Sequence, residues 1–401
     1  MLDVEPLYLK IGASEVEEIS VTATTMVQLV RQHMFAPGSL KHPPRLTVSD
    51  ICSYAKKTRA QFYASVKKEN KLPTGVKKNN RLDYTLDEAR QWVKFLTPGR
   101  QKNPSVNCAV TIAVANFKGG VTKTTTTATL AQGLSLRGYD VLVIDLDPQG
   151  SLSNLFGLLA DIDVEEDQTV MELYAGTQKT IDPAIQKTYW SGIDIVAASP
   201  VLHNAEFILP VRQQKEAGFN FGSILDLGLD SAREKYDVIL IDTPPSLSYT
   251  TVNALMAADG IIMPLPPSPL DFASSAQFWN LCNDIMKGLT LGKNSPEKKY
   301  NFIDVVLCRV DKSVGVSSVV RDWIIRSYGA KVIPVEIPKT AIADTASAGF
   351  GTVYDVQSTP SLAKTLKRAK DAYEQFVDHI ETQIQGVWVG VLNTENRKDN
   401  P

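Results

Sequence analysis

The stretch VTIAVANFKGGVTKTT, residues 110–125, decides the fold expected of this 401-residue chain. An apolar run, Val110 to Ala115, meets a pair of glycines, and a Lys-Thr pair follows. This order predicts a buried strand, a tight loop and the N-terminus of a helix. Such loops and helix N-termini present backbone N–H groups to phosphate oxygens. The stretch therefore indicates a phosphate-binding loop.

The loop departs from the common phosphate-binding pattern. An ordinary Walker A loop reads G-x-x-x-x-G-K-[ST], but Phe117 and Thr122 occupy the positions of its two outer glycines. The chain instead fits K-G-G-x-x-K-[ST], which adds an early lysine, Lys118, to the usual one, Lys123. Any function assigned to the loop has to explain why it carries two lysines.

The other loop residues also suit a nucleotide. Glycines at 119 and 120 let the backbone approach phosphate oxygens closely. Lys123 would neutralise charge between the terminal phosphates, and the Thr124 hydroxyl can bind Mg²⁺. The residues expected to bind the nucleotide in this loop are Lys118, Gly119, Gly120, Val121, Thr122, Lys123, Thr124 and Thr125.

Two later apolar runs end in carboxylates. Residues 141–149 read VLVIDLDPQ, and residues 236–246 read YDVILIDTPPS. Side chains two positions apart share one side of an extended chain, and the ends of parallel strands face the ligand crevice of an α/β sheet. Of Asp145 and Asp147, one could hold a Mg²⁺-bound water while the other orients the attacking water. Asp242 would hold the Mg²⁺ shell, so the expected metal residues are Thr124, Asp145 and Asp242.

Residues 105–401 alternate between apolar runs and helical segments. The runs are continuous, which predicts strands buried on both faces of a mostly parallel sheet. We therefore expect a doubly wound α/β domain, with surface loops or insertions at 210–221 and 292–300. The expected strands are Val110–Ala115, Val141–Ile144, Ile193–Ala198, Val238–Ile241, Ile261–Leu265, Phe302–Leu307 and Val332–Ile337.

Charge is unevenly distributed along the chain. The net charge is −2, yet fifteen Lys or Arg stand against five Asp or Glu between Lys41 and Lys102, a surplus of +10. A basic module on an acidic body indicates a polyanion as the partner of that module.

Residues 41–104 have the outline of a winged helix-turn-helix DNA-binding domain. A short helix precedes a turn at residues 56–58, and a second helix runs from Arg59 to Glu69. The basic segment 76–82 is typical of a hairpin tip, like a wing. The alternative is a solvated basic surface on a small helical adaptor. The candidate DNA contacts are Lys56, Lys57, Thr58, Arg59, Gln61, Lys67, Lys68, Lys77, Lys78 and Arg81.

Residues 1–40 contain one helical pattern, because apolar residues recur at spacings of three and four from Val16 to Met34. This helix could pack on its own chain or pair with a second subunit. We take it as an N-terminal dimerisation helix.

The cellular compartment follows from what the sequence lacks. Four widely spaced cysteines without a C-x-x-C argue against a disulfide framework, a zinc ribbon or an iron–sulfur site, and they suit a reducing cytoplasm. The first residues do not read as a signal peptide. No segment approaches the roughly 18 apolar residues of a membrane span. We expect a cytoplasmic protein without membrane attachment.

Three motifs together resemble a known family. KGGVTKTT (118–125), DLDPQG (145–150) and DTPPS (242–246) resemble the deviant Walker A ATPases of the ParA/MinD group, and the DPQG form is similar to ParA partition proteins. The basic module ahead of them resembles the larger plasmid-partition ParA subclass of low-copy plasmids, including prophage plasmids. The resemblance covers essentially the whole chain.

The resemblance implies roles for individual residues. Lys118 would reach across a nucleotide-sandwich dimer to the partner's phosphates, and Asp147 matches the water-activating aspartate. The implied catalytic set is therefore Lys118, Lys123 and Asp147. Pro338 and Lys339, in the segment Ile337–Lys339, match positions that line the adenine, with Asp344 and Gly349–Gly351 close by.

The resemblance also implies a cycle. ATP with Mg²⁺ would drive homodimer formation and non-specific DNA binding on the nucleoid, and a centromere-binding ParB-type partner would stimulate a weak hydrolysis. The ADP state would favour operator binding and repression of the protein's own operon. A nucleotide-sensing repressor without a segregation role is the alternative, and such a repressor would tolerate Asp147→Ala.

Two other functions fit the sequence less well. A membrane-positioning relative needs an amphipathic membrane helix at its C-terminus. The final helix, about residues 361–385, carries an apolar stripe that suits packing on the sheet. Its basic cluster at 364–370 suits either DNA or solvent. A metal-cluster scaffold disagrees with the cysteine spacing.

Overall fold

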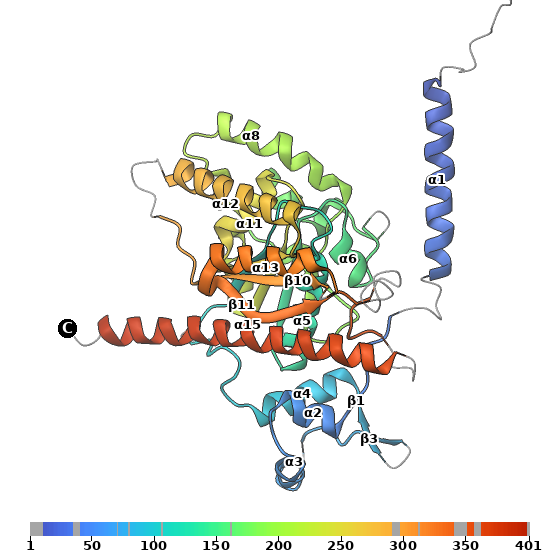
Figure 1. The fold of residues 1–401 in the computed structure, drawn as a ribbon, viewed down its shortest axis with the longest axis vertical. Helices are drawn as coiled ribbons and strands as arrows, with labels where there is room; N and C mark the ends of the chain where they lie inside the picture. The colour runs from blue at the N-terminus through green and yellow to red at the C-terminus, as the bar shows by residue number, and fades with distance from the viewer. Residues whose placement is uncertain are drawn as a thin grey trace, which may run out of the picture. The chain divides into compact units, whose positions relative to one another are not determined.

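The chain forms two compact units, Met1–His42 and Pro43–Pro401. The computed structural model describes residues 11–34, 41–69, 71–78, 81–105, 107–160, 163–290, 297–311, 313–340, 351–356 and 362–398. The first unit holds the 22-residue helix α1 (Ala13–Met34; Figure 1). The Gly12 N–H donates to the Glu15 carboxylate at 2.6 Å at the start of this helix.

An eight-stranded sheet organises the second unit, in the order β11-β10-β9-β4-β8-β5-β7-β6. Neighbouring strands are parallel except β6 and β7. All seven expected apolar runs form strands, so the predicted α/β fold is confirmed; the short edge strand β6 was not predicted. The strands are β4 (Val110–Val114), β5 (Val141–Asp145), β6 (Gln186–Lys187), β7 (Ile193–Val196), β8 (Val238–Asp242), β9 (Gly260–Leu265), β10 (Phe302–Val310) and β11 (Val332–Pro338).

Helices cover both faces of the sheet (Figure 1). Alternate residues of the central strands belong to two separate core clusters; in β4, for example, Ile112 packs in one and Ala113 in the other. α5 and α15 contribute to the first cluster, and α11, α12 and α13 to the second. The α-helices are α5 (Lys123–Leu136), α6 (Ser151–Leu155), α7 (Met171–Ala175), α8 (Ala205–Lys215), α9 (Ile224–Gly228), α10 (Asp230–Lys235), α11 (Tyr249–Ala257), α12 (Pro269–Thr290), α13 (Gly315–Tyr328) and α15 (Ala363–Lys398).

One sequence expectation is wrong in part: residues 210–215 are helical, whereas residues 216–220 form no helix or strand. A loop or insertion was predicted at residues 210–221, but α8 continues through Pro210 to Lys215. Proline removes one helical hydrogen bond, whereas the buried side chains of Ala205 and Leu209 hold this helix against the second core cluster. Packing therefore outweighs the local preference. In the other predicted loop, 292–300, residues 292–296 lie outside the described residues.

The basic module is a small helical unit with a hairpin. Its three helices are α2 (Val48–Tyr54), α3 (Arg59–Val66) and α4 (Leu86–Leu96). Each begins with a reciprocal capping box, which satisfies N–H groups that the first turn leaves unpaired. α3 ends three residues before the predicted Glu69. The small sheet has the order β1-β3-β2, with β1 (Leu46–Thr47), β2 (Val76–Lys78) and β3 (Arg81–Tyr84).

The module is anchored to the C-terminal end of α5. The Arg90 side chain, only 7% exposed, donates to the carbonyls of Ser135 and Tyr139 at 3.0 and 2.8 Å, and it pairs with Asp140 at 2.7 Å. α5 begins at the phosphate loop, so one helix connects that loop with the basic module. No helix among the described residues combines the length and apolar character needed to cross a membrane.

Candidate nucleotide site and basic module

The phosphate loop follows β4 and is anchored to a neighbouring strand. The buried Asn116 amide donates to the carbonyl of Pro264, at the end of β9, at 2.9 Å, and its oxygen accepts the Lys118 N–H at 3.2 Å. Gly120 has a φ of +75°, which glycine adopts without steric cost. A Cβ at Gly119 would meet nothing closer than 3.9 Å, and one at Gly120 would meet nothing within 4 Å. The loop therefore has the open space of a phosphate cradle.

Thr122 is the loop's strained residue. It lies at φ +68° and ψ +23°, just before α5 begins at Lys123. Left-handed backbone is unfavourable for a β-branched residue, and a glycine would occupy it freely. The missing glycine noted in the sequence is thus a real departure, because the backbone keeps the conformation that favours glycine.

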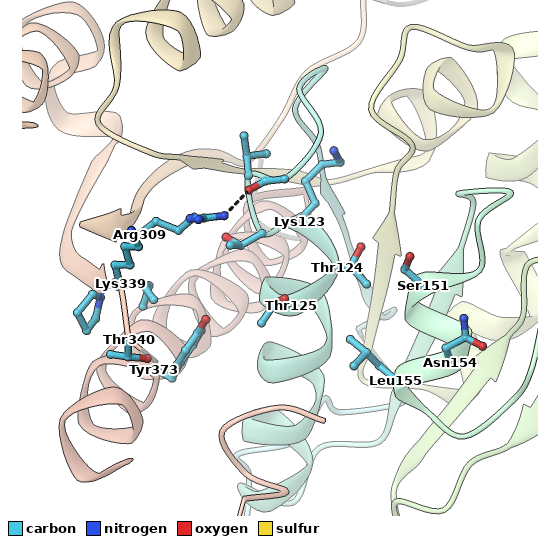
Figure 2. Close-up of a pocket in the computed structure, with 15 residues that line it drawn as sticks. Lys123, Thr124, Thr125, Ser151, Asn154, Leu155, Arg309, Lys339, Thr340 and Tyr373 are labelled. Atoms are coloured by element: carbon cyan, nitrogen blue, oxygen red, sulfur yellow. Dashed lines mark hydrogen bonds between the residues drawn. The ribbon is translucent and has the colours of Figure 1, made fainter. Parts of the chain in front are cut away.

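The two lysines of the loop line different cavities. Lys123 lines a cavity of about 410 Å³, here called the inner cavity, whereas Lys118 lines a cavity of about 580 Å³, here called the outer cavity. The inner cavity is lined by residues 120–125, Ser151, Asn154, Leu155, Arg309, 337–340 and Tyr373 (Figure 2). The outer cavity is lined by residues 118–120, 266–269, Asp271, Arg309, Asp311, Val314, Val316, Ser317 and Lys339.

Each lysine is held by a different partner. The Lys123 ammonium donates to the carbonyl of Lys118 at 3.0 Å inside the curve of the loop. Burial lowers the pKa of Lys123, and the charges of Asp242 and Asp147 partly offset this effect. The Lys118 ammonium instead pairs with Asp271, in the first turn of α12, at 2.6 Å.

Carboxylates close the inner end of the site. Asp145 and Asp242 are register partners at the ends of β5 and β8 and are fully buried. The Thr124 hydroxyl donates to Asp242 at 2.7 Å, and the Thr127 hydroxyl donates to its other oxygen at 3.3 Å. Burial raises the pKa of both carboxyls; the charge of Asp242 adds to the effect at Asp145, while the bond from Thr124 opposes it at Asp242. The sequence-predicted residues Thr124, Asp145 and Asp242 are therefore brought together.

Asp145 also orders the segment that carries Asp147. One Asp145 oxygen accepts bonds from the N–H and hydroxyl of Ser153, both at 2.8 Å. Its other oxygen accepts the Asp147 N–H at 3.2 Å. The half-buried Asp147 accepts the Gln149 N–H at 3.0 Å, so its carboxylate is positioned by a local turn. The sequence analysis missed Ser153, although a serine at the start of α6 could have indicated its role.

The wall opposite α6 comes from distant parts of the chain. The predicted residues Pro338 and Lys339, at the end of β11, line the inner cavity. Figure 2 shows Arg309 and Tyr373 near Lys339, with Tyr373 projecting from α15. The sequence analysis missed both side chains, since nothing in their local pattern marks them.

The segment expected beside this wall is described only at its end. Asp344 and Gly349 lie outside the described residues, whereas Gly351 is described and buried. The expectation that Asp344 lies near the base therefore stays a prediction.

The predicted DNA contacts are exposed, with differences among them. Lys56 has a φ of +50° in the turn between α2 and α3, and it pairs with Asp378 of α15 at 3.3 Å. The Gln61 amide oxygen accepts the Thr58 N–H at 2.8 Å, so this side chain caps α3. The other candidates, all with exposed side chains, are Lys57, Thr58, Arg59, Lys67, Lys68, Lys77, Lys78 and Arg81.

The chain is similar to proteins that are already known. Residues 109–293 match the AAA domain family. The chromosome partitioning protein ParA of Caulobacter vibrioides is 30% identical over 272 residues, which is 67% of this chain and 95% of that protein. Protein SopA of Escherichia coli K12 is 29% identical over 316 residues, 78% of this chain and 74% of SopA.

A solved structure shares the fold of the sheet domain. Cobyrinic acid a,c-diamide synthase from Mycobacterium smegmatis, with bound ATP analog and magnesium, is 28% identical with a TM-score of 0.52. The match covers 67% of this chain and 93% of that one. The ParA relative and the phosphate loop with its two lysines lead to one family: the chain belongs to the ParA-type partition ATPases.

Proposed function

We propose that the chain binds ATP and ADP with Mg²⁺ at the phosphate loop and hydrolyses ATP to drive the partition of plasmid DNA. One observation carries this proposal: Lys123 lines the inner cavity, whereas Lys118 lines the outer cavity. A loop that only stored nucleotide would need the inner lysine alone. The similar synthase binds an ATP analogue with magnesium in its structure.

The residues around the inner cavity fit a magnesium ion. Mg²⁺ prefers one or two carboxylates together with substrate phosphates and water. The Thr124 hydroxyl and the Asp242 carboxylate, 2.7 Å apart, would hold it, with Asp145 acting through water because Ser153 occupies one of its oxygens. The ion would neutralise charge on the terminal phosphates.

Three residues would carry the hydrolysis. Lys123 binds the terminal phosphates from within the subunit, and Asp147 orients the attacking water. Lys118 contacts the phosphates of a second copy in a nucleotide-sandwich dimer, which requires it to leave Asp271. Because ATP offers one more phosphoryl group than ADP for such contacts, the nucleotide shifts the monomer–dimer equilibrium. ATP hydrolysis by the chain alone is therefore weak, because a partner is needed to complete the nucleotide site.

The basic module would bind DNA as a winged helix-turn-helix, which makes residues 41–104 a domain of its own beside the ATPase domain, 105–401. α3 is short and starts with exposed Thr58 and Arg59, and the hairpin exposes Lys77 and Lys78. Arginine can read base edges, whereas lysines add salt-dependent affinity through phosphates. The capping bond of Gln61 gives it a structural task beside any contact with bases.

The remaining features complete the cycle that we propose. α1, within residues 1–40, pairs two copies, and a ParB-type centromere-binding protein stimulates hydrolysis. The protein works in the cytoplasm on the nucleoid, and its ADP state represses its own operon. The alternative is a nucleotide-sensing repressor that takes no part in segregation, and the basic module favours it as much as it favours the first proposal.

DNA binding in the apo, ADP and ATP states tests the proposal. Random DNA and the DNA upstream of the gene are compared, with Lys123→Gln as the matched variant. We expect ATP to promote binding to random DNA, ADP to favour the upstream DNA, and Lys123→Gln to lose both responses. Binding that is specific for the upstream DNA and indifferent to nucleotide would contradict the segregation role.

A further inference from the structure

Strand β10 contains an extra residue near its end. Between Leu307 and Val310, three steps along β10 match two along β11, from Glu336 to Pro338. Leu307 and Val310 pack in the same core cluster, although strict alternation would place them on opposite faces of the sheet. A bulge of this kind turns one side chain away from both faces.

Arg309 is the residue that the bulge turns outward. It has a φ of +52° and is exposed, between the buried Cys308 and Val310. Left-handed backbone is unfavourable for residues with a Cβ. Residues strained in this way gather at functional sites. The position of Arg309 therefore calls for a functional explanation.

The side chain of Arg309 bridges two parts of the inner cavity. Its Nη1 donates to the carbonyl of Gly120, in the phosphate loop, at 3.3 Å. The next residue, Val310, is the register partner of Pro338, and its carbonyl accepts the Lys339 N–H at 3.1 Å. Figure 2 shows the side chain extending from the Lys339 wall to the loop.

We propose that Arg309 is a positioning residue whose flat guanidinium stacks on the base of the bound nucleotide, a purine. One edge of the guanidinium is already bonded to the loop, so its face is left for the ligand. Arginine attracts aromatic rings through its face. Pro338 and Tyr373 supply the neighbouring apolar surface. This inference rests on the proposed nucleotide function and adds a residue that none of the motifs contains.

Calorimetric titration of the full chain tests the inference, with ADP–Mg²⁺ and with pyrophosphate–Mg²⁺, which lacks the base. Arg309→Ala and Arg309→Gly are compared with wild type, and Arg326→Ala, on the exposed face of α13, is the control. Both Arg309 variants should bind ADP about tenfold more weakly and pyrophosphate as wild type does. Arg309→Gly should melt at a higher temperature than Arg309→Ala, because only glycine relaxes the bulge.

Three results would overturn the inference. ADP binding equal to wild type in both Arg309 variants would exclude a ligand contact. An equal loss for ADP and pyrophosphate would assign Arg309 to the phosphates instead of the base. A melting temperature of Arg309→Gly no higher than that of Arg309→Ala would show that the backbone at Arg309 is not strained. A wild-type chain that binds neither ligand would instead refute the proposed nucleotide function, which separates the two failures.

Discussion

The inner and outer cavities share one loop but are built differently. The inner cavity is lined by the start of α5, by α6 and by the end of β11, and Lys123 there is buried and bonded to backbone. The outer cavity holds Lys118, which is one third exposed and paired with one carboxylate, and Val314 and Val316 line it with exposed apolar side chains. A buried cation that is held by a backbone hydrogen bond suits a fixed ligand. Lys118, which is held by a single ion pair beside exposed apolar surface, can leave Asp271 for another partner.

The largest effect that we expect is a difference in ADP binding between variants of the two lysines. Lys123→Gln removes a buried charge from the phosphate cradle and should weaken ADP binding by about 100-fold or more. Lys118→Gln should change ADP binding by no more than about twofold, because this lysine faces the outer cavity. Calorimetric titration of ADP–Mg²⁺ measures both variants. Equal losses in the two variants would remove the distinction between the cavities.

Asp147→Asn tests the hydrolysis step at the inner cavity. The amide keeps the size of the side chain but loses its ability to take a proton. We expect ATP hydrolysis to fall about 100-fold or more, with ADP binding unchanged. Phosphate release and calorimetry on the same preparation measure the two quantities. Hydrolysis at the wild-type rate would exclude Asp147 as the water-orienting residue and favour the repressor alternative.

Asp271→Asn should act on the outer cavity alone. The variant removes the charge that holds Lys118 at 2.6 Å, and a partly exposed pair of this kind is worth about 1 kcal/mol. Each dimer needs two free Lys118 side chains, so we expect the protein concentration for half-maximal hydrolysis to fall about 25-fold. Asp284→Asn, exposed on the same helix, is the control. A higher concentration requirement would mean that Asp271 supports the active arrangement.

Thr122→Gly should have the smallest effect, a change in stability at a residue that lines the inner cavity. Glycine relaxes the left-handed backbone at φ +68° and should stabilise the apo protein by about 1 kcal/mol, with ADP binding near wild type. Chemical denaturation followed by far-ultraviolet circular dichroism measures the change. A destabilised variant would show that contacts of the threonine side chain outweigh the strain of its backbone.

The sequence predicts the inner site better than its walls. The loop and the carboxylates follow buried strands, and continuous apolar runs such as Val238–Asp242 mark those strands directly. The bulge at Arg309 depends on register between β10 and β11, and Tyr373 reaches the cavity from a helix near the other end of the chain. Neither is encoded in local pattern, because both depend on tertiary packing.

The basic module shows the same division. Its three capping boxes have the short patterns T-x-x-D, T-x-x-Q and T-x-x-E, but the sequence analysis took Gln61 of the second one only as a DNA contact. The ion pair of Lys56 with Asp378 is a long-range contact that no local motif indicates.

Mixing the two glutamine variants tests most directly whether the lysines act in different subunits. Lys118→Gln keeps an intact inner cavity but offers no outer lysine, and Lys123→Gln keeps the outer lysine but loses the inner one. A mixed dimer contains one complete site, so ATP hydrolysis of an equal mixture should recover about a quarter of the wild-type rate, since half of the dimers are mixed. A mixture no more active than its separate components, beside an active wild type, would contradict the account.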